Sequence, residues 1–184
     1  MSQSLYTSNI IAESLQRLHQ HKPEALPDNL EKLRILNRGA LAEMRTLLLE
    51  LRPEKLAASS MEELLQQLAD AARARTGLSV EVQVQSALEL PVAVKEALYR
   101  ITQEALTNII KHARASHVLV RYTGQAGEVR LMVEDDGQGF DLATASPGRM
   151  GIGNMQDRMA AVGGRVQIDA EVGGGTLVTA TWAE

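Results

Sequence analysis

The fold is decided by one stretch, VKEALYRITQEALTNIIKHA from Val94 to Ala113, which combines an apolar helical stripe with one polar edge. The apolar residues recur every three or four positions, the period of a helix that packs one face against a core; they are Val94, Leu98, Ile101, Ala105, Ile109 and Ala113. Glu104, Asn108 and Lys111 follow the same spacing beside that stripe. We therefore expect a buried helix whose polar edge can meet a ligand.

The composition limits the class of protein. A chain of 184 residues can form one main domain with a helical appendage. The net charge of -4 leaves no basic excess to neutralise phosphates, so we expect no nucleic-acid partner. The absence of cysteine excludes disulfides and thiolate metal sites, and it fits a reducing cytoplasm. No run approaches the roughly 18 apolar residues of a membrane span, so we expect a soluble, cytoplasmic chain without membrane contact.

The N-terminal part reads as two helices joined by a proline-bounded turn. The pattern predicts one helix from Ser2 to about His21 and a second from Leu30 to Leu51. Asp28 and Glu31 resemble a capping box at the start of the second helix. That helix carries a heptad seam with one polar interruption: Leu30, Leu33, Asn37, Ala40, Met44, Leu47 and Leu51. We expect two copies of this hairpin to pair as a four-helix bundle; packing onto its own domain is the alternative.

The composition loosens after Pro53, which places the predicted domain boundary between residues 56 and 57. Residues 1–56 would form a dimerisation hairpin and residues 57–184 a second domain. That domain is predicted to contain a helix that begins after a capping box at Ser60 and Glu63. The remaining elements are the central helix, a short helix opening at Gly151, and strands over 80–84, 117–122, 129–134, 166–170 and 177–182.

This order of elements predicts an α+β fold, an α/β sandwich with the helices on one face of a mixed, mostly antiparallel sheet. A doubly wound fold is excluded by the hairpin-like succession of strands. The segment from Asp141 to Met150 has no periodicity and reads as a mobile loop or lid.

Three glycine groups could together help to supply what a nucleotide needs: Gly137 with Gly139, Gly151 with Gly153, and Gly173 to Gly175. Asp135 at the end of a strand is a fixed acceptor for an exocyclic amine, which distinguishes adenine from guanine. Gly137 and Gly139 let the backbone approach a flat base. The turn Gly151-Ile152-Gly153 leaves N–H groups free at a helix N-terminus for phosphate oxygens. Each group alone also fits an ordinary turn, helix start or hairpin loop, so the inference rests on their combination.

The polar helix edge would complete such a site. Asn108 offers a neutral carbonyl oxygen to Mg²⁺ that is also held by phosphates and water. Lys111 adds a positive point charge for phosphate. Glu104, one turn from Asn108, could place a carboxylate near the terminal phosphate as a base or a water-orienting group. The alternative is a solvated Asn108 beside a surface pair of Glu104 and Lys111.

Four motifs occur in an order that resembles the GHKL-type ATPase superfamily of gyrase, heat-shock-90 chaperones, mismatch-repair proteins and sensor histidine kinases. The resembling motifs are QEALTNIIKHA (Gln103 to Ala113) for the N box, DDGQG (Asp135 to Gly139) for the G1 box, GIGN (Gly151 to Asn154) for the G2 box and GGGT (Gly173 to Thr176) for the last glycine box. The resemblance implies a Bergerat-type fold with ATP and Mg²⁺ as cofactors. It also implies that His112 lies beside the phosphates or ribose and that Thr176 belongs to the nucleotide site.

The N-terminal part resembles one subfamily. RGALAEMRTLLLELRP (Arg38 to Pro53) is similar to the second dimerisation helix of bacterial histidine kinases that have a short lid and pair with helix-turn-helix response regulators. SQSLY (Ser2 to Tyr6) is similar to the residues that follow their phosphoacceptor site. The resemblance implies a homodimeric protein histidine kinase of two-component signal transduction. It would pass the γ-phosphoryl of Mg-ATP to a histidine and then to an aspartate of a response-regulator receiver domain.

In that subfamily the phosphoacceptor histidine and its acidic neighbour would precede Met1, and neither is present here. The chain is therefore interpreted as the cytoplasmic portion of a sensor that could be membrane-anchored, and we expect it not to autophosphorylate. The acid beside the missing histidine is an alternative to Glu104 as the base. Two other functions share the ATPase domain: an anti-sigma-factor-like serine kinase and a non-catalytic nucleotide-sensing dimer. The heptad hairpin favours the histidine kinase because the serine kinases lack it.

Overall fold

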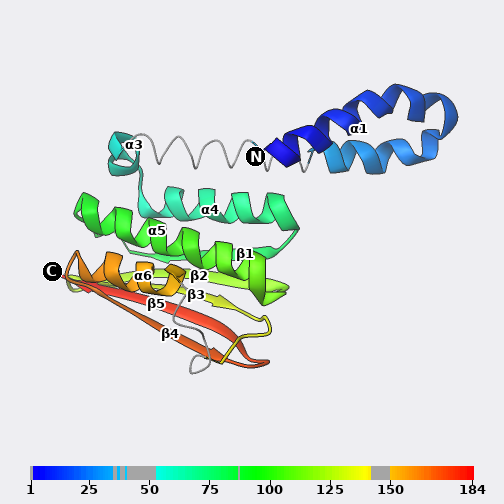
Figure 1. The fold of residues 1–184 in the computed structure, drawn as a ribbon. Coiled ribbons are helices and arrows are strands. Elements are labelled where there is room, and N and C mark those ends of the chain that lie inside the picture. The colour runs from blue at the N-terminus through cyan, green and yellow to red at the C-terminus, as the bar shows by residue number, and fades with distance from the viewer. Residues whose placement is uncertain (1, 35–36, 38–39, 41–52, 87, 142–149) are drawn as a thin grey trace.

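The computed structural model describes residues 2–34, 37, 40, 53–86, 88–141 and 150–184 (Figure 1). The helical elements are α1 (Ser2–His21), the 3-10 turn η1 (Pro23–Ala25), α3 (Pro53–Ala58), α4 (Met61–Thr76), α5 (Val92–Asn108), the π-helical turn η2 (Ile109–Ala113) and α6 (Met150–Ala160). The strands are β1 (Ser79–Gln85), β2 (His117–Gln125), β3 (Glu128–Asp135), β4 (Arg165–Glu171) and β5 (Gly175–Ala183). No helix among these residues is both long and apolar enough to cross a membrane.

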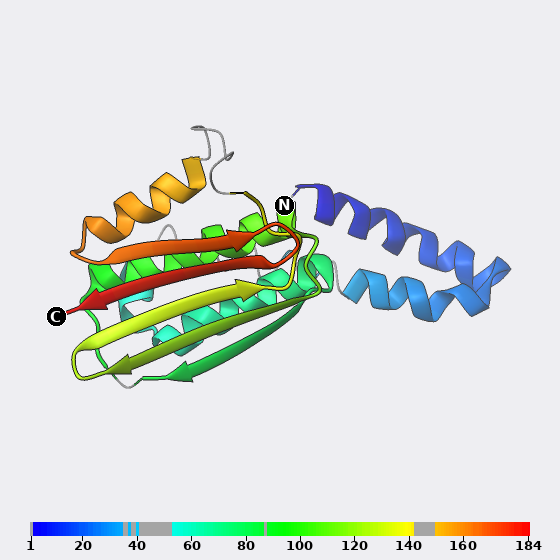
Figure 2. The same cartoon turned by 90° about the horizontal axis from the view of Figure 1, so that it is seen from below.

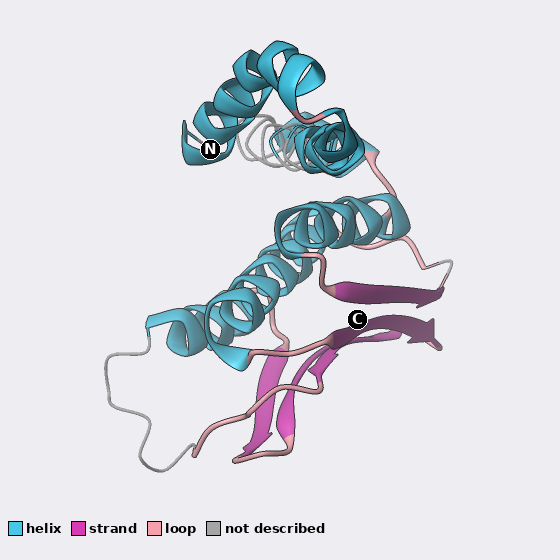
Figure 3. Ribbon diagram, turned by 90° about the vertical axis from the view of Figure 1, so that its right-hand side faces the viewer, coloured by secondary structure: helices cyan, strands magenta, loops and turns pink. Residues whose placement is uncertain are grey.

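The five strands form a single mixed sheet with the order β1-β2-β3-β5-β4. β1 and β2 are parallel, and the other neighbouring strands are antiparallel. α4, α5 and α6 lie on one face of the sheet, and the other face is open (Figures 1 and 3). The α+β sandwich predicted from the order of elements is therefore confirmed. The register places Asp135 of β3 opposite Val118 of β2 on one side and Thr176 of β5 on the other.

The central helix packs as its apolar stripe predicts. All six stripe residues are buried, with Leu98 and Ile101 fully enclosed between α4 and the sheet. Burying each large aliphatic side chain contributes about 1.5–3 kcal/mol. From the sheet, the core receives the inward residues of β2 and β3, which alternate with less buried, mostly polar ones.

The start of α4 confirms the predicted capping box. Ser60 Oγ accepts a hydrogen bond from the Glu63 N–H at 3.1 Å, and Glu63 Oε2 accepts one from the Ser60 N–H at 2.9 Å. These bonds satisfy N–H groups that have no partner inside the helix. At the other end, Gly77 has a φ of 71° and donates its N–H to Arg73 O, so it ends α4 as a left-handed C-cap.

The capping box predicted at Asp28 is wrong. Residues 26–34 are already helical and continue directly from η1, so Asp28 lies inside the helix rather than at its N-cap. Pro27 does not prevent this early start, because a proline in the first turn removes an N–H that would have no helical partner. Glu31 pairs instead with Arg34, with an Oε1 to Nη2 distance of 2.6 Å. The heptad seam from Met44 onward lies outside the described residues, as does most of the predicted lid.

The helical hairpin extends beyond one end of the sandwich (Figures 1 and 2). Part of the predicted seam is used within the hairpin, since Ser8 Oγ of α1 donates to Asn37 Oδ1 at 2.6 Å and Ala40 is buried. Ile10 and Leu30, in contrast, are 49% and 50% exposed. Asn37, the one polar residue of the seam, therefore joins the two helices within one chain. Pairing between two copies of the hairpin stays a prediction.

α3 spans the predicted domain boundary between residues 56 and 57. Leu56 belongs to the core of the sandwich, and Lys95 Nζ of α5 donates to Ala57 O and Ser59 O at 3.0 and 2.9 Å. The connection between hairpin and sandwich is thus held against α5, and the exact boundary stays a prediction.

Candidate functional site

A cavity of about 700 Å³ lies among the end of α5, η2, the start of α6 and strands β3, β4 and β5. Eight of the eleven predicted site residues line it: Asn108, Lys111, His112, Asp135, Gly139, Gly151, Ile152 and Thr176. Apolar side chains provide part of its wall, among them Ile109, Val133, Met155, Ile168 and Val178. An apolar wall with a few convergent polar groups is typical of a small-molecule site.

Asp135 is the buried polar group of this cavity, with only 5% of its surface exposed. Its Oδ1 accepts a hydrogen bond from the Gly137 N–H at 2.8 Å. Its Oδ2 has no hydrogen-bond partner among the described residues. Burial raises the pKa of this carboxyl and Asp136 adds to the rise, whereas the Gly137 N–H and the nearby Thr176 hydroxyl oppose it. A buried acceptor without a partner costs free energy, so a ligand that donates a hydrogen bond here removes that cost.

The adjacent Asp136 is exposed and has a structural role. Its Oδ1 accepts from the Ser116 and His117 N–H groups at 2.8 and 2.9 Å, and its Oδ2 accepts from Ser116 Oγ at 2.5 Å. These bonds, the hydroxyl first, lower the pKa of Asp136 to about 2. It therefore ties the turn after β3 to the start of β2, while its neighbour Asp135 faces the cavity.

The neighbouring backbone leaves no room for a side chain at Gly137 or Gly139. A Cβ at Gly137 would overlap Ala113 O and would lie 2.7 Å from Ala113 Cβ, so η2 packs directly on this backbone. Gly139 has a φ of 54°, and a Cβ there would overlap the carbonyl oxygen of Glu171. Gly139 lines the cavity. Gly137 lies beneath Asp135 and does not line it.

The structure corrects the shape of the central helix near the site. α5 ends at Asn108 and continues as the π-helical η2, in which the wider turn changes the spacing of the side chains. Lys111 therefore does not continue the stripe of Glu104 and Asn108 with regular α-helical spacing. Lys111 and His112 are exposed along one wall of the cavity, and Arg114 follows in the left-handed region with a φ of 54°.

The two glycines of α6 have different surroundings. A Cβ at Gly151 would overlap Glu104 Oε1 and would lie 3.5 Å from Asn108 Nδ2, so the start of α6 contacts the polar edge of α5. Gly153 is exposed, and nothing lies within 4 Å of a Cβ there. Gly153 does not line the cavity, and neither does Glu104, which stands behind Gly151. Within the described ranges, no group of three or more His, Asp or Glu side chains is arranged to hold a metal ion.

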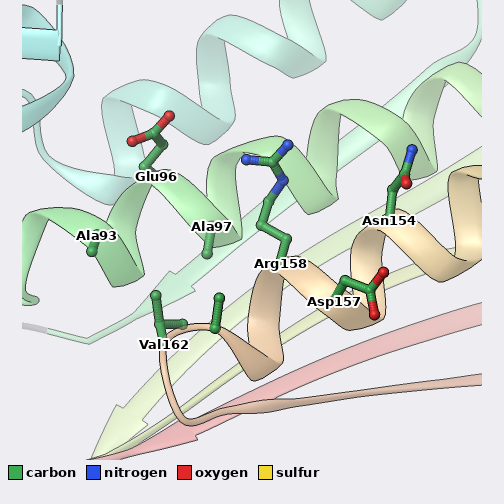
Figure 4. A pocket seen from close by; sticks show the side chains of 8 residues that line it. Ala93, Glu96, Ala97, Asn154, Asp157, Arg158 and Val162 are labelled. Atoms are coloured by element: carbon green, nitrogen blue, oxygen red, sulfur yellow. The ribbon is translucent and has the colours of Figure 1, made fainter.

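A second hollow, of about 600 Å³, lies where α5 begins and α6 ends (Figure 4). Its walls combine small side chains such as Ala93 and Ala97 with the charged Glu96, Asp157 and Arg158. It contains none of the predicted site residues. The cavity at Asp135 is therefore the candidate site.

Sequence reasoning missed several lining residues of the site, among them Arg114, Gln138 and Phe140. Gln138 stands between the glycines of DDGQG, and no local pattern assigns it a role. Arg114 directly follows the polar edge of the central helix, and its positive charge next to Lys111 is a signal that could have identified it.

The fold and the cavity together define a class: a small-molecule-binding α+β sandwich joined to a helical hairpin. Residues 93–184 match the family described as histidine kinase-, DNA gyrase B- and HSP90-like ATPase, and residues 1–56 match a family described as histidine kinase. The chain belongs to the histidine kinase-, DNA gyrase B- and HSP90-like ATPase family, as the four motifs predicted. Membership implies that the sandwich binds ATP.

Similar proteins are sensor kinases. The chain is 33% identical over 187 residues to an uncharacterized sensor-like histidine kinase of Chloroflexus aurantiacus, covering 97% of this chain and 31% of that protein. It is 29% identical over 181 residues to the sensor histidine kinase LiaS of Bacillus subtilis, covering 97% of this chain and 49% of LiaS. The chain thus spans half or less of the length of these curated relatives.

Solved structures share the fold. The histidine kinase domain of the Erythrobacter litoralis EL346 blue-light activated histidine kinase superimposes with a TM-score of 0.61 at 23% identity, covering 95% of this chain and 93% of that one. The mycobacterial sensor histidine kinase MprB superimposes with a TM-score of 0.54 at 20% identity, covering 68% of this chain and 95% of that one.

Proposed function

We propose that the cavity binds Mg-ATP and that the chain is the ATP-binding and dimerisation part of a two-component sensor histidine kinase. The observation that carries the proposal is Asp135, a buried carboxylate that lines the nucleotide-sized cavity and whose Oδ2 has no hydrogen-bond partner among the described residues. The histidine kinase match over residues 1–56 favours this function over an anti-sigma-factor-like serine kinase. A non-catalytic nucleotide-sensing dimer is the remaining alternative.

The adenine would lie at Asp135. Its exocyclic amine can donate to Asp135 Oδ2, and guanine would present a carbonyl oxygen at the same place, where two acceptors repel each other. Gly139 and the wall residues Met155 and Ile168 leave a slot for the flat ring. Binding of ATP in preference to GTP follows from this geometry.

The triphosphate would lie along η2 and the start of α6. Lys111 and His112 are exposed at that wall, and the N-terminal N–H groups near Gly151 can meet phosphate oxygens. Asn108 is half-buried and lines the cavity, so its carboxamide oxygen fits a Mg²⁺ ion that is also bound by phosphates and water. When bound, the ion would neutralise the charge that develops on the phosphates.

In the proposed reaction, the bond between the γ-phosphorus and its bridging oxygen breaks, a bond from phosphorus to an acceptor histidine nitrogen forms, and ADP leaves. The imidazole proton passes to a base. Glu104, which lies behind Gly151 and does not line the cavity, is the proposed base or orienting group, and the acid beside the acceptor histidine is the alternative. A response-regulator aspartate would then receive the phosphoryl group.

Isothermal titration tests the nucleotide site. Asp135→Asn keeps the shape of the side chain but removes its charge, and it should weaken ATP binding roughly 10- to 100-fold, the range for losing a hydrogen bond to a charged group. The ratio of ATP affinity to GTP affinity should also be smaller in Asp135→Asn than in wild type, because the new carboxamide can donate a hydrogen bond to the guanine carbonyl. Glu134→Gln is the matched control, since Glu134 is exposed on the opposite face of β3.

Unchanged ATP affinity in Asp135→Asn would show that adenine does not bind there. Because the expected acceptor histidine is not among the four histidines of this chain, the chain alone should take up no acid-labile phosphate from γ-labelled ATP. Acid-stable phosphate transferred to a partner would favour the serine kinase alternative.

Light scattering tests the proposed homodimer. The exposed Ile10 and Leu30 could meet their counterparts in a second copy. The wild-type chain should have twice the mass of one 20.0 kDa chain, and a variant with aspartate at both positions should have the mass of one. A wild-type mass of one chain at micromolar concentration contradicts pairing through residues 1–56.

A further inference from the structure

We propose that Gln138 positions the π-helical turn η2, and with it the phosphate-facing side chains of the nucleotide site. This inference rests on the proposed function, because it assigns the residue that holds one wall of that site in place.

The end of η2 needs external hydrogen-bond donors. The last carbonyl groups of any helix lack partners within it, and a π-helical turn is a conformation that helices seldom adopt without support. Gln138 supplies both donors: its Nε2 donates to His112 O at 2.8 Å, and its backbone N–H donates to Ala113 O at 2.8 Å. One residue of the turn after β3 therefore satisfies two consecutive carbonyls of η2.

The position of Gln138 is itself constrained on both sides. Gly137 packs against Ala113 with no room for a side chain, and Gly139 packs against the backbone of Glu171 with a φ of 54°. The Gln138 carbonyl oxygen accepts a hydrogen bond from the Gly173 N–H at 2.8 Å. Gln138, which lines the cavity, therefore connects η2 to the turn between β4 and β5.

The side-chain bond has the larger functional consequence. The two backbone bonds survive any substitution of Gln138 except proline, whereas the Nε2 bond to His112 O depends on the carboxamide. Loss of that bond frees the segment that carries Lys111 and His112, while Asp135 stays in β3. Gln138 is thus a positioning residue that affects triphosphate binding and leaves adenine binding unchanged.

The test compares Mg-ATP with adenosine by isothermal titration. Gln138→Met has nearly the same length and lacks the donor, so it should weaken Mg-ATP binding roughly three- to tenfold, the range for one hydrogen bond. Its adenosine affinity should stay within about twofold of wild type, because adenosine has no phosphate. Gln125→Met, an exposed position at the end of β2, is the matched control and should change neither affinity.

A double-mutant cycle with Lys111→Ala tests whether Gln138→Met weakens Mg-ATP binding by displacing Lys111. If Gln138 acts by positioning η2, the double variant Lys111→Ala, Gln138→Met should bind Mg-ATP nearly as well as Lys111→Ala alone. Hydrogen exchange of the amides from 109 to 114 should be faster in ligand-free Gln138→Met than in wild type.

Several results would overturn the inference: unchanged Mg-ATP affinity, equal weakening of ATP and adenosine, fully additive effects with Lys111→Ala, or unchanged exchange in η2. Loss of binding in Asp135→Asn together with normal binding in Gln138→Met would overturn the role of Gln138 and leave the nucleotide site intact. A wild-type chain that binds neither ligand would overturn the proposed function and this inference together.

Discussion

Alanine substitutions at Gly137 and Gly153 should change stability in opposite directions, although both glycines belong to motifs of the same predicted site. Neither has a positive φ, so alanine can adopt either backbone conformation and only the surrounding space differs. A Cβ at Gly137 would overlap Ala113 O and would lie 2.6 Å from Asp135 Oδ1, whereas nothing lies within 4 Å of one at Gly153.

The magnitudes follow from this difference in space. The atoms around Gly137 belong to η2 and to a buried carboxylate, which cannot move without disturbing the site, so the cost should reach about 1–3 kcal/mol, as for other overpacked interiors. Gly153 lies in the exposed first part of α6, where replacing glycine with alanine should gain about 0.5–1 kcal/mol. For a chain of this size each kcal/mol shifts the melting temperature by roughly 2–4 °C.

Thermal unfolding followed by circular dichroism, with urea titration as a second measure, tests the pair. Gly137→Ala should melt several degrees below wild type, and Gly153→Ala should melt at or slightly above it. If Gly137→Ala is as stable as Gly153→Ala, then η2 does not pack on the G1 turn as described, and the explanation for Gly137 is wrong.

Three further predictions concern capping and pH. Ser60→Ala should lower the free energy of unfolding by about 1 kcal/mol in urea titration through loss of the α4 cap, and Ser59→Ala, outside the cap, should not. Because the pKa of Asp136 is lowered from 3.8 to about 2, its contribution to stability is complete above pH 3.8 and disappears as pH falls toward 2. In Asp136→Asn the free energy of unfolding should therefore depend less on pH between 2 and 3.8. Because burial raises the pKa of Asp135, the nucleotide-free protein should lose stability as pH rises above the ordinary aspartate pKa, and Asp135→Asn should remove that slope.

Local pattern was enough to predict most of the architecture. Hydrophobic spacing identified the buried stripe of α5, the alternation of valines identified β1, and Ser60 with Glu63 identified the start of α4, because each depends on residues within a few positions of one another. The second helix was misplaced because two signals competed: Asp28 and Glu31 have capping-box spacing, but Pro27 fits a first helical turn equally well.

The motifs also indicated which segments meet, since the eight predicted residues that line the cavity come from four separate parts of the chain. They selected Asp135 but assigned no role to its neighbour Asp136. Only the tertiary structure shows that Asp136, just after the end of β3, is exposed and bound to the backbone of Ser116 and His117.

The sequence by itself determined most of the helices, the strands and the family of ATPases to which the chain belongs, because these depend on short-range periodicity and on motifs of fixed spacing. Tertiary structure decided the π-helical turn at the end of α5, the contact of Gly151 with Glu104, and the bonds of Gln138 to His112 and Gly173. These features depend on contacts between residues that are far apart in the chain. The free energies of such contacts cannot be read from the spacing of neighbouring residues.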